Sequence, residues 1–366
     1  MGGEMVCGGQ CANLSVDVNN CGGCGRRCCA GLTCSGGTCT AGCAAGTTFC
    51  IPESTGTLTC FGGICTNLAT DPQHCGRCNT ACAAGARCVQ GACTSRTPDG
   101  SFIPVPPRSA GEVEVVAANL GGVQGLLLRP DGRSALVSAT GLGVIWLVDW
   151  SVTPTRATRW AENLTGPSQL TYAPSGDVVV AEREGNRVTR IAVNPDGSAG
   201  QRTPFAASFT GPWGVVYDPT GRLLVSNEFG DSVDRIDAGG AVTRAIVPRF
   251  GGPLELRFDP GGRLYVGDYG NPLTSGTRVF VYNPDLSLLR TLTGVSGPIG
   301  MALDTSGNVY VANYTTNNVV RVTPTNAATP YVTGLTGPHA IAFDASGSLY
   351  VNDYGTGRLL RFPARY

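Results

Sequence analysis

In the part of the chain that follows Cys93, Glu255 and His339 have side chains suited to acid–base or metal chemistry. Each follows a Gly-Pro pair, where the corresponding stretches of the chain carry Gly, Ala, Leu, Ile or Ser. A carboxylate and an imidazole can transfer protons, and both can ligate a divalent metal. We therefore predict that both lie on a central axis as candidate catalytic residues. No cofactor is firmly implied, and Ca²⁺ or Zn²⁺ on the axis stays an open alternative.

A larger group of polar and aromatic residues follows the same Gly-Pro pairs or ends a later apolar run. We expect these loops to emerge on one face, and we predict a ligand-binding rim of Gln169, Glu182, Trp213, Asn227, Glu228, Asp268, Tyr269, Asn313, Tyr314, Asp353 and Tyr354. Two structural alternatives stay open. The acidic and amide side chains that share one repeat position can accept hydrogen bonds from loop amides. The tyrosines, which recur with Phe229, can pack beneath the loops.

These residues belong to a segment that recurs six times. Copies begin at Gly122, Gly166, Gly211, Gly252, Gly297 and Gly337, and their turn glycines are 40 to 45 residues apart. Self-similarity at this period indicates repeated supersecondary units. Each copy has short apolar runs separated by turns, and runs such as Val178-Val179-Val180 are typical of strands buried on both faces. The pattern predicts an all-β protein with a six-bladed β-propeller.

The start and end of the repeats also predict how the ring closes. The last copy ends with its third strand, and an apolar stretch at residues 113–120 precedes the first copy without a turn partner of its own. We predict that Val113, Val115 and Val116 form the outermost strand of the last blade, because an open ring would leave exposed sheet edges.

The Gly-Pro-x-Gly, Asp-Pro-x-Gly and Leu-Tyr-Val-x-Asp segments of residues 112–366 resemble NHL repeats and the six-bladed propellers that include gluconolactonase-like proteins. Members of that group hold a divalent metal on the axis with Glu, Asn and Asp, and Glu255 is the residue here that matches. Gly337-Pro338-His339-Ala340, with Glu182 and Glu228, is similar to the setting of the histidine in streptogramin lyases. The resemblance implies a propeller scaffold that serves receptors, hydrolases and lyases alike.

All seventeen cysteines lie within residues 1–93. Six cysteines from Cys11 to Cys39 and six from Cys65 to Cys93 share the spacings 10, 3, 4, 6 and 5. These modules resemble the stigma-specific protein family. Such density favours disulfides and an oxidising, extracellular or cell-surface location. The alternative is zinc, because Cys21-x-x-Cys24 has ligand-like spacing.

We predict four parts: Cys-rich module 1 (1–40), module 2 (41–94), a Pro-rich linker (95–111) and the propeller (112–366). We expect module 1 to be truncated at Met1, with the export signal upstream of this sequence.

The composition limits the classes of partner. Lys plus Arg equals Asp plus Glu at 26 each, with no basic tract, so nothing indicates nucleic acid. No apolar run is long enough for a transmembrane helix. We predict a monomeric, secreted or surface-attached binding protein whose propeller rim recognises a protein, peptide or glycan. The alternative is an extracellular lyase or lactonase-like hydrolase that uses Glu255 and His339.

Overall fold

A computed structural model describes residues 4–25, 28, 32–41, 48–50, 64–67, 71, 73, 75, 86–89, 92–96, 102–103, 109–247, 250–271 and 274–365. The regular elements in this part of the chain are strands and two 3₁₀ turns, Thr140–Leu142 and Tyr354–Thr356. The chain divides into two compact units, Met1–Thr94 and Ser95–Tyr366. None of the described residues forms a helix of the length and hydropathy needed to cross a membrane.

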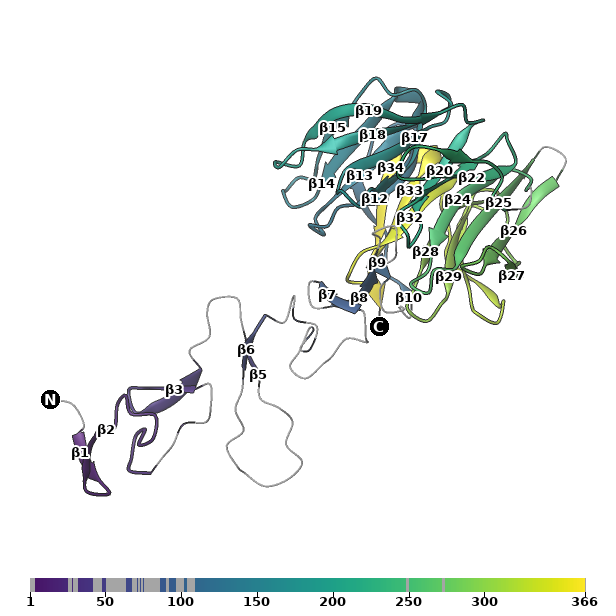
Figure 1. Cartoon of the computed structure of the whole chain (residues 1–366). Coiled ribbons are helices and arrows are strands. Elements are labelled where there is room, and N and C mark those ends of the chain that lie inside the picture. The colour runs from purple at the N-terminus through teal and green to yellow at the C-terminus, as the bar shows by residue number, and fades with distance from the viewer. Residues whose placement is uncertain are drawn as a thin grey trace. The chain divides into compact units, whose positions relative to one another are not determined.

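The second unit contains six four-stranded antiparallel sheets, which we number as blades 1 to 6 (Figure 1). Blade 1 contains β12 (Val123–Leu128), β13 (Ser134–Ala139), β14 (Val144–Asp149) and β15 (Arg156–Ala161), and blade 2 contains β16 (Pro167–Tyr172), β17 (Val178–Glu182), β18 (Arg187–Val193) and β19 (Ala199–Ala207). Blade 3 contains β20 (Pro212–Tyr217), β21 (Leu223–Asn227), β22 (Ser232–Ile236) and β23 (Val242–Thr243), and blade 4 contains β24 (Pro253–Phe258), β25 (Leu264–Asn271), β26 (Thr274–Tyr282) and β27 (Leu288–Leu292). Blade 5 contains β28 (Pro298–Leu303), β29 (Val309–Asn313), β30 (Asn318–Val322) and β31 (Ala328–Val332), and blade 6 contains β32 (Pro338–Phe343), β33 (Leu349–Asp353), β34 (Arg358–Phe362) and β11 (Glu114–Ala117). The first strand of each blade contacts the first strand of the next, and β32 contacts β12. The predicted all-β, six-bladed propeller is therefore confirmed.

The apolar second strands form the core between neighbouring blades. Every residue of β17 and β21 is buried. Val179 and Val188 of blade 2 share one apolar cluster with Val215, Leu223 and Val225 of blade 3. A strand that is buried on both faces cannot be covered by its own sheet alone. The packing of successive blades is therefore what stabilises each repeat.

The innermost strands approach one another closely, and this requires glycine in alternate blades. A Cβ atom at Gly214 would lie 2.2 Å from the carbonyl oxygen of Leu254, and one at Gly300 would lie 2.2 Å from that of His339. A side chain larger than hydrogen would separate these strands. The second residue after the Gly-Pro pair is larger in the other three blades, where it is Gln169, Glu255 or Ala340.

The ring is closed by a strand from before the first repeat. β11 pairs antiparallel with β34, with Val115 opposite Leu360 and Glu114 opposite Arg361. The strand is shorter than the predicted stretch 113–120. Val113, which was predicted to belong to this strand, lies just outside it, and Val113 and Val115 are each 54% exposed. Val116 packs against the core between blades 6 and 1.

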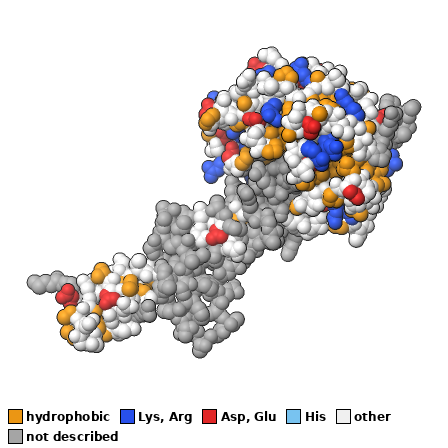
Figure 2. All heavy atoms as spheres, viewed as in Figure 1, with side chains coloured by type: hydrophobic (Ala, Val, Ile, Leu, Met, Phe, Trp, Pro, Cys, Tyr) orange, Lys and Arg blue, Asp and Glu red, His pale blue; other side chains and the backbone are white. Residues whose placement is uncertain are grey.

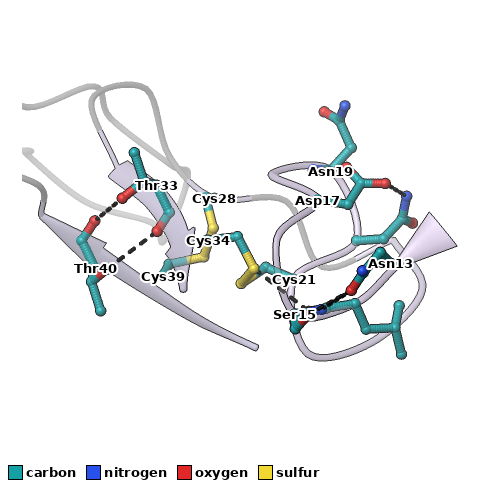
Figure 3. Close-up of a disulfide and its surroundings, with 12 residues drawn as sticks. Asn13, Ser15, Asp17, Asn19, Cys21, Cys28, Thr33, Cys34, Cys39 and Thr40 are labelled. Atoms are coloured by element: carbon teal, nitrogen blue, oxygen red, sulfur yellow. Dashed lines mark hydrogen bonds between the residues drawn. A yellow bond between two sulfur atoms is a disulfide. The ribbon is translucent and has the colours of Figure 1, made fainter. Parts of the chain in front are cut away.

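The first unit contains short hairpins held by disulfides. In module 1, β1 (Glu4–Cys7) pairs with β2 (Gln10–Asn13), and β3 (Leu32–Ser35) pairs with β4 (Thr38–Ala41). Disulfides join Cys7 to Cys24, Cys21 to Cys34 and Cys28 to Cys39; Figure 3 shows the last two. Cys21 and Cys24 therefore belong to different disulfides and are not a thiolate pair for zinc.

In module 2, the disulfide Cys75–Cys88 repeats the position of Cys21–Cys34. The strands of this module are β5 (Thr48–Cys50), which pairs with β6 (Ile64–Thr66), and β7 (Ala86–Val89), which joins the sheet of β8 (Ala92–Arg96). The disulfide-rich N-terminal region is thus confirmed.

Two short strands lie within the predicted linker 95–111. β9 (Phe102–Ile103) pairs with Ser95 and Arg96 of β8, and β10 (Ser109–Ala110) pairs with β35 (Ala364–Arg365). On the propeller face drawn in Figure 2, basic and acidic side chains are interspersed, as expected for a chain with no net charge.

Candidate ligand pocket on the propeller axis

The acidic and amide residues at the end of each second strand hold loops in place. In blades 2 to 6, one side-chain oxygen accepts a hydrogen bond from the backbone N–H of the residue 17 positions earlier, at 2.6–3.2 Å. These five residues, all buried, are Glu182, Asn227, Asp268, Asn313 and Asp353. Arginines pair with two of them, Arg187 with Glu182 at 2.6 Å and Arg278 with Asp268 at 3.3 Å. The structural alternative thus accounts for these predicted rim residues.

The residues directly after these loop-holding positions line a pocket of about 220 Å³. We call it the ring pocket, and it is built from two tiers of equivalent residues. The lower tier follows the first residue of the innermost strands and consists of Gln124, Trp213, Leu254, Ile299 and His339. The upper tier follows the second strands and consists of Arg183, Glu228, Tyr269, Tyr314 and Tyr354. Since all six blades contribute, the pocket lies on the propeller axis.

Aromatic rings surround His339 in this pocket. The centroid of its imidazole lies 4.4 Å from the ring of Tyr354, 5.4 Å from that of Tyr314 and 6.0 Å from that of Trp213. Tyr269 meets Tyr314 edge-on, at 6.3 Å between centroids. The rings therefore offer an apolar wall with edges and faces for a ligand.

The tyrosines also pack against backbone, as the alternative interpretation proposed. A Cβ atom at Gly122 would lie 2.9 Å from the ring of Tyr354, and one at Gly337 would lie 2.9 Å from the ring of Tyr314. In both cases the ring lies over the glycine that precedes the first strand of the next blade. Packing and pocket formation are thus combined in the same side chains.

One ion pair stands at the edge of the ring pocket. Arg183 of blade 2 binds Glu228 of blade 3 through two hydrogen bonds, Nε to Oε2 at 2.5 Å and Nη2 to Oε1 at 3.1 Å. The guanidinium also lies 5.4 Å from the centroid of Trp213 and 4.7 Å from that of Phe229. A bidentate pair of this kind fixes both side chains and cancels their charges.

Two buried polar atoms in the lower tier have no hydrogen-bond partner, Nδ1 of His339 and Oε1 of Gln124. Their side chains are nearly buried, with His339 4% and Gln124 9% exposed. Burial, together with the positive charge of Arg183, lowers the pKa of His339 to about 3. The imidazole is therefore neutral at physiological pH and presents one donor and one acceptor.

Glu255 lies outside the ring pocket. Its carboxylate accepts a hydrogen bond from Nε2 of Gln169 at 2.6 Å and forms an ion pair with Arg257 at 2.9 Å. Gln169 belongs to blade 2 and Glu255 to blade 4, so the contact bridges two blades that are not neighbours. Glu255 therefore faces the axis at this contact.

Glu255 and His339 do not occupy equivalent positions. Pro253 pairs with Asp268, and Pro338 pairs with Asp353. His339 therefore corresponds to Leu254, and Glu255 corresponds to Ala340. His339 is the first residue after its Gly-Pro pair and Glu255 is the second, and the residues in the first place line the ring pocket in every blade but blade 2, whereas those in the second do not.

The structure thus divides the predicted site residues into two groups. Trp213, Glu228, Tyr269, Tyr314, His339 and Tyr354 line the ring pocket, whereas Gln169, Glu182, Asn227, Glu255, Asp268, Asn313 and Asp353 do not. Sequence reasoning missed Gln124, Arg183, Leu254 and Ile299. Their repeat positions were the available signal, because each is equivalent to a residue that was predicted.

The axial residues do not fit a divalent metal. Glu255 already has a cationic partner in Arg257, and Glu228 has one in Arg183. Over the described part of the chain, the one group of three or more metal-ligating types within reach of each other is Cys21, Cys28 and Cys39. All three form disulfides.

Comparison with known proteins gives a family for one module and a fold for the propeller. Residues 40–96 match the sequence model of the stigma-specific STIG1-like protein family. No curated protein sequence matches the chain.

Several solved structures share the propeller fold. A streptogramin B lyase is similar with a TM-score of 0.52 at 14% identity, covering 70% of this chain and 98% of that one. A gluconolactonase from Xanthomonas campestris has a TM-score of 0.57 at 15% identity, with coverages of 71% and 97%. An auxiliary nutrient binding protein from Bacteroides thetaiotaomicron has a TM-score of 0.55 at 12% identity, with coverages of 67% and 70%. These similarities establish the fold, which occurs in both enzymes and binding proteins.

Proposed function

We propose that this chain is an extracellular, monomeric, non-catalytic binding protein, and that its ligand is held in the ring pocket. The observation that carries the proposal is the bidentate pair of Arg183 and Glu228, which leaves the carboxylate of the pocket without a free charge. Proton transfer at a substrate requires an acid or base whose pKa is close to the working pH. His339, whose pKa is about 3, does not meet that requirement, and Glu228 is already held by Arg183.

The pocket has the features of a recognition site instead. It combines an aromatic wall with a few fixed polar groups, which is the usual composition of small-ligand sites in proteins. Tyr314 and Tyr354 lie over glycines of the next blade, and Arg183 and Glu228 hold each other. A site whose side chains are already fixed loses little conformational entropy on binding.

An extracellular location is supported by the N-terminal unit. Four disulfides are described there, and disulfides persist in oxidising compartments. The match of residues 40–96 to the stigma-specific family supports the same location. We propose that the two modules form a protease-resistant stalk or a second binding element.

Binding and analysis of the bound ligand would test this function. The full chain is screened on arrays of glycans, peptides and extracellular proteins, and retained ligands are recovered and weighed by mass spectrometry. We expect a ligand that is retained by the parent, lost with Tyr314→Ala and recovered chemically unchanged. Phe205→Ala is the matched control, because Phe205 is an aromatic residue of β19, the outermost strand of blade 2, outside the pocket lining.

Two outcomes would contradict the proposal. The first is a ligand recovered as a cleaved or rearranged product, which would support the lyase or hydrolase alternative. The second is retention that Tyr314→Ala leaves unchanged, which would place binding elsewhere on the chain.

A further inference from the structure

The polar atoms of the ring pocket that lack partners indicate what kind of ligand group is missing. Oε1 of Gln124 and Nδ1 of His339 are buried and unpaired, and they come from blades 1 and 6, which are neighbours at the closure of the ring. Leaving a buried polar atom without a hydrogen bond destabilises the folded chain. A ligand that supplies both partners would remove that destabilisation. Hydroxyl groups suit this role because each can donate and accept.

The charges of the pocket favour an uncharged ligand. Arg183 and Glu228 neutralise each other at the pocket edge, and His339 is neutral. An anionic ligand would meet Glu228, and a cationic ligand would meet Arg183, whose guanidinium already lies over the ring of Trp213. The buried charge of such a ligand would lose its hydration without gaining an unpaired counter-charge. The same paired side chains can still exchange hydrogen bonds with neutral hydroxyls.

The apolar surface of the pocket favours a ring with one face of C–H groups. Trp213, Tyr269, Tyr314 and Tyr354 supply aromatic surface, while Leu254 and Ile299 complete the apolar lining. Aromatic faces carry negative charge density and attract the weakly positive hydrogens of a sugar ring. A ligand with hydroxyls on its edge and C–H groups on its face is a pyranose.

The size of the pocket limits how much of a glycan can enter. Its volume of about 220 Å³ lies below the 300–1,000 Å³ that is typical of sites for drug-sized ligands. One pyranose ring is of the right order, whereas an internal residue with chain on both sides would need an open groove.

We infer that the ring pocket binds the terminal residue of a glycan as a single uncharged pyranose ring. Aromatic side chains cover its C–H face, and Gln124 and His339 bind its hydroxyls. This inference rests on the proposed binding function and names its ligand class.

Titration of the full chain with small sugars would test the inference. The probes are the methyl pyranosides of glucose, galactose, mannose and N-acetylglucosamine, with glucuronic acid and choline as charged comparators. Binding is measured by saturation-transfer NMR and calorimetry. We expect at least one neutral pyranoside to bind with a Kd of about 1 mM or tighter, and neither charged comparator to bind.

Two variants and one control connect that binding to the pocket. Gln124→Leu and His339→Phe each remove an unpaired polar atom at similar volume, so we expect each to weaken binding about tenfold. We expect neither substitution to lower the melting temperature, because each one removes a buried polar atom that has no hydrogen-bond partner in the folded chain. Gln201→Leu, at an exposed position of β19, is the matched control and should bind like the parent.

Absence of binding by every neutral pyranoside at about 50 mM would overturn the inference. Equal binding by the parent, Gln124→Leu and His339→Phe would also overturn it. A peptide or protein retained on the arrays and lost with Tyr314→Ala, with no pyranoside bound, would refute the glycan class and leave the proposed binding function standing.

Discussion

Among individual residues, the loop-holding positions show how one repeat position tolerates different side chains. The side chains at this position differ in charge and length, yet in each blade a side-chain oxygen accepts a hydrogen bond from the equivalent backbone N–H. The five residues are Glu182, Asn227, Asp268, Asn313 and Asp353. What the position selects is therefore a buried acceptor rather than a charge. A carboxylate at such a position is a poor indicator of catalysis.

This interpretation predicts the effect of two substitutions at Asp353. Asp353→Ala removes the acceptor for the N–H of Thr336 and for Oγ1 of Thr356, so we expect a loss of about 1–3 kcal/mol in the free energy of unfolding. Asp353→Asn keeps an amide oxygen, as in the equivalent Asn227 and Asn313, and should lose much less. Chemical denaturation measures both. Equal losses for the two variants would show that the charge itself matters.

The pKa of His339 gives a prediction about acid stability. Its pKa is about 3 in the folded chain, against an ordinary value of 6.5. Between pH 6.5 and pH 3, His339 is therefore protonated in the unfolded chain and neutral in the folded chain. This difference does not reduce the free energy of unfolding above pH 6.5, and it reduces that free energy progressively as the pH is lowered from 6.5 towards 3.

The measurement is a comparison of melting temperatures between pH 7 and pH 4. We expect His339→Phe to lose less stability than the parent over this range, because it has no group to protonate at that position. The loop-holding carboxylates are common to both proteins and cancel in the difference. Parallel pH curves for the two proteins would refute the prediction.

Among the elements, strand β11 is the one that converts six repeats into a closed ring. It pairs with β34 through Glu114, Val115 and Ala117, while Val113 and Val115 remain largely exposed. Its contribution thus comes from backbone hydrogen bonds and from the packing of Val116, not from burial of three valines. Covering the outer edge of β34 is the structural result.

Deleting residues 113–118 should therefore lower the melting temperature or cause edge-to-edge aggregation, because the edge of β34 would be exposed. Light scattering and thermal melting measure this. The double variant Val113→Thr, Val115→Thr is the control, and we expect it to change the free energy of unfolding by less than about 0.5 kcal/mol. A deletion that melts like the parent and does not aggregate would show that β11 is dispensable.

For the whole molecule, the two compact units depend on different interactions. Every cysteine lies within residues 1–93, and the propeller is held by apolar clusters between blades. We therefore expect a fragment of residues 108–366 to fold and melt like the propeller of the full chain. We also expect a reducing agent to unfold module 1 and leave the propeller transition unchanged. Calorimetry with and without reductant resolves the two transitions, and an insoluble fragment would contradict this independence.

By itself the sequence determined the class of fold. A period of 40 to 45 residues, runs such as Val178-Val179-Val180 and an unpaired apolar stretch before the first repeat were enough to predict a closed six-bladed propeller. They suffice because repeat length and hydrophobic pattern are local properties, and only a few architectures satisfy them together. The cysteine spacing determined the disulfide-rich modules in the same way.

Tertiary structure alone decided which polar residues form a site. His339, the first residue after its Gly-Pro pair, lines the ring pocket, whereas Glu255, the second residue after its pair, meets Gln169 and Arg257 instead. The neutralisation of Glu228 by Arg183 joins two blades 45 residues apart in the sequence. Neither the direction of a side chain beside a bulge nor a partner on another blade is a property of the local sequence, since both are set by how the blades pack.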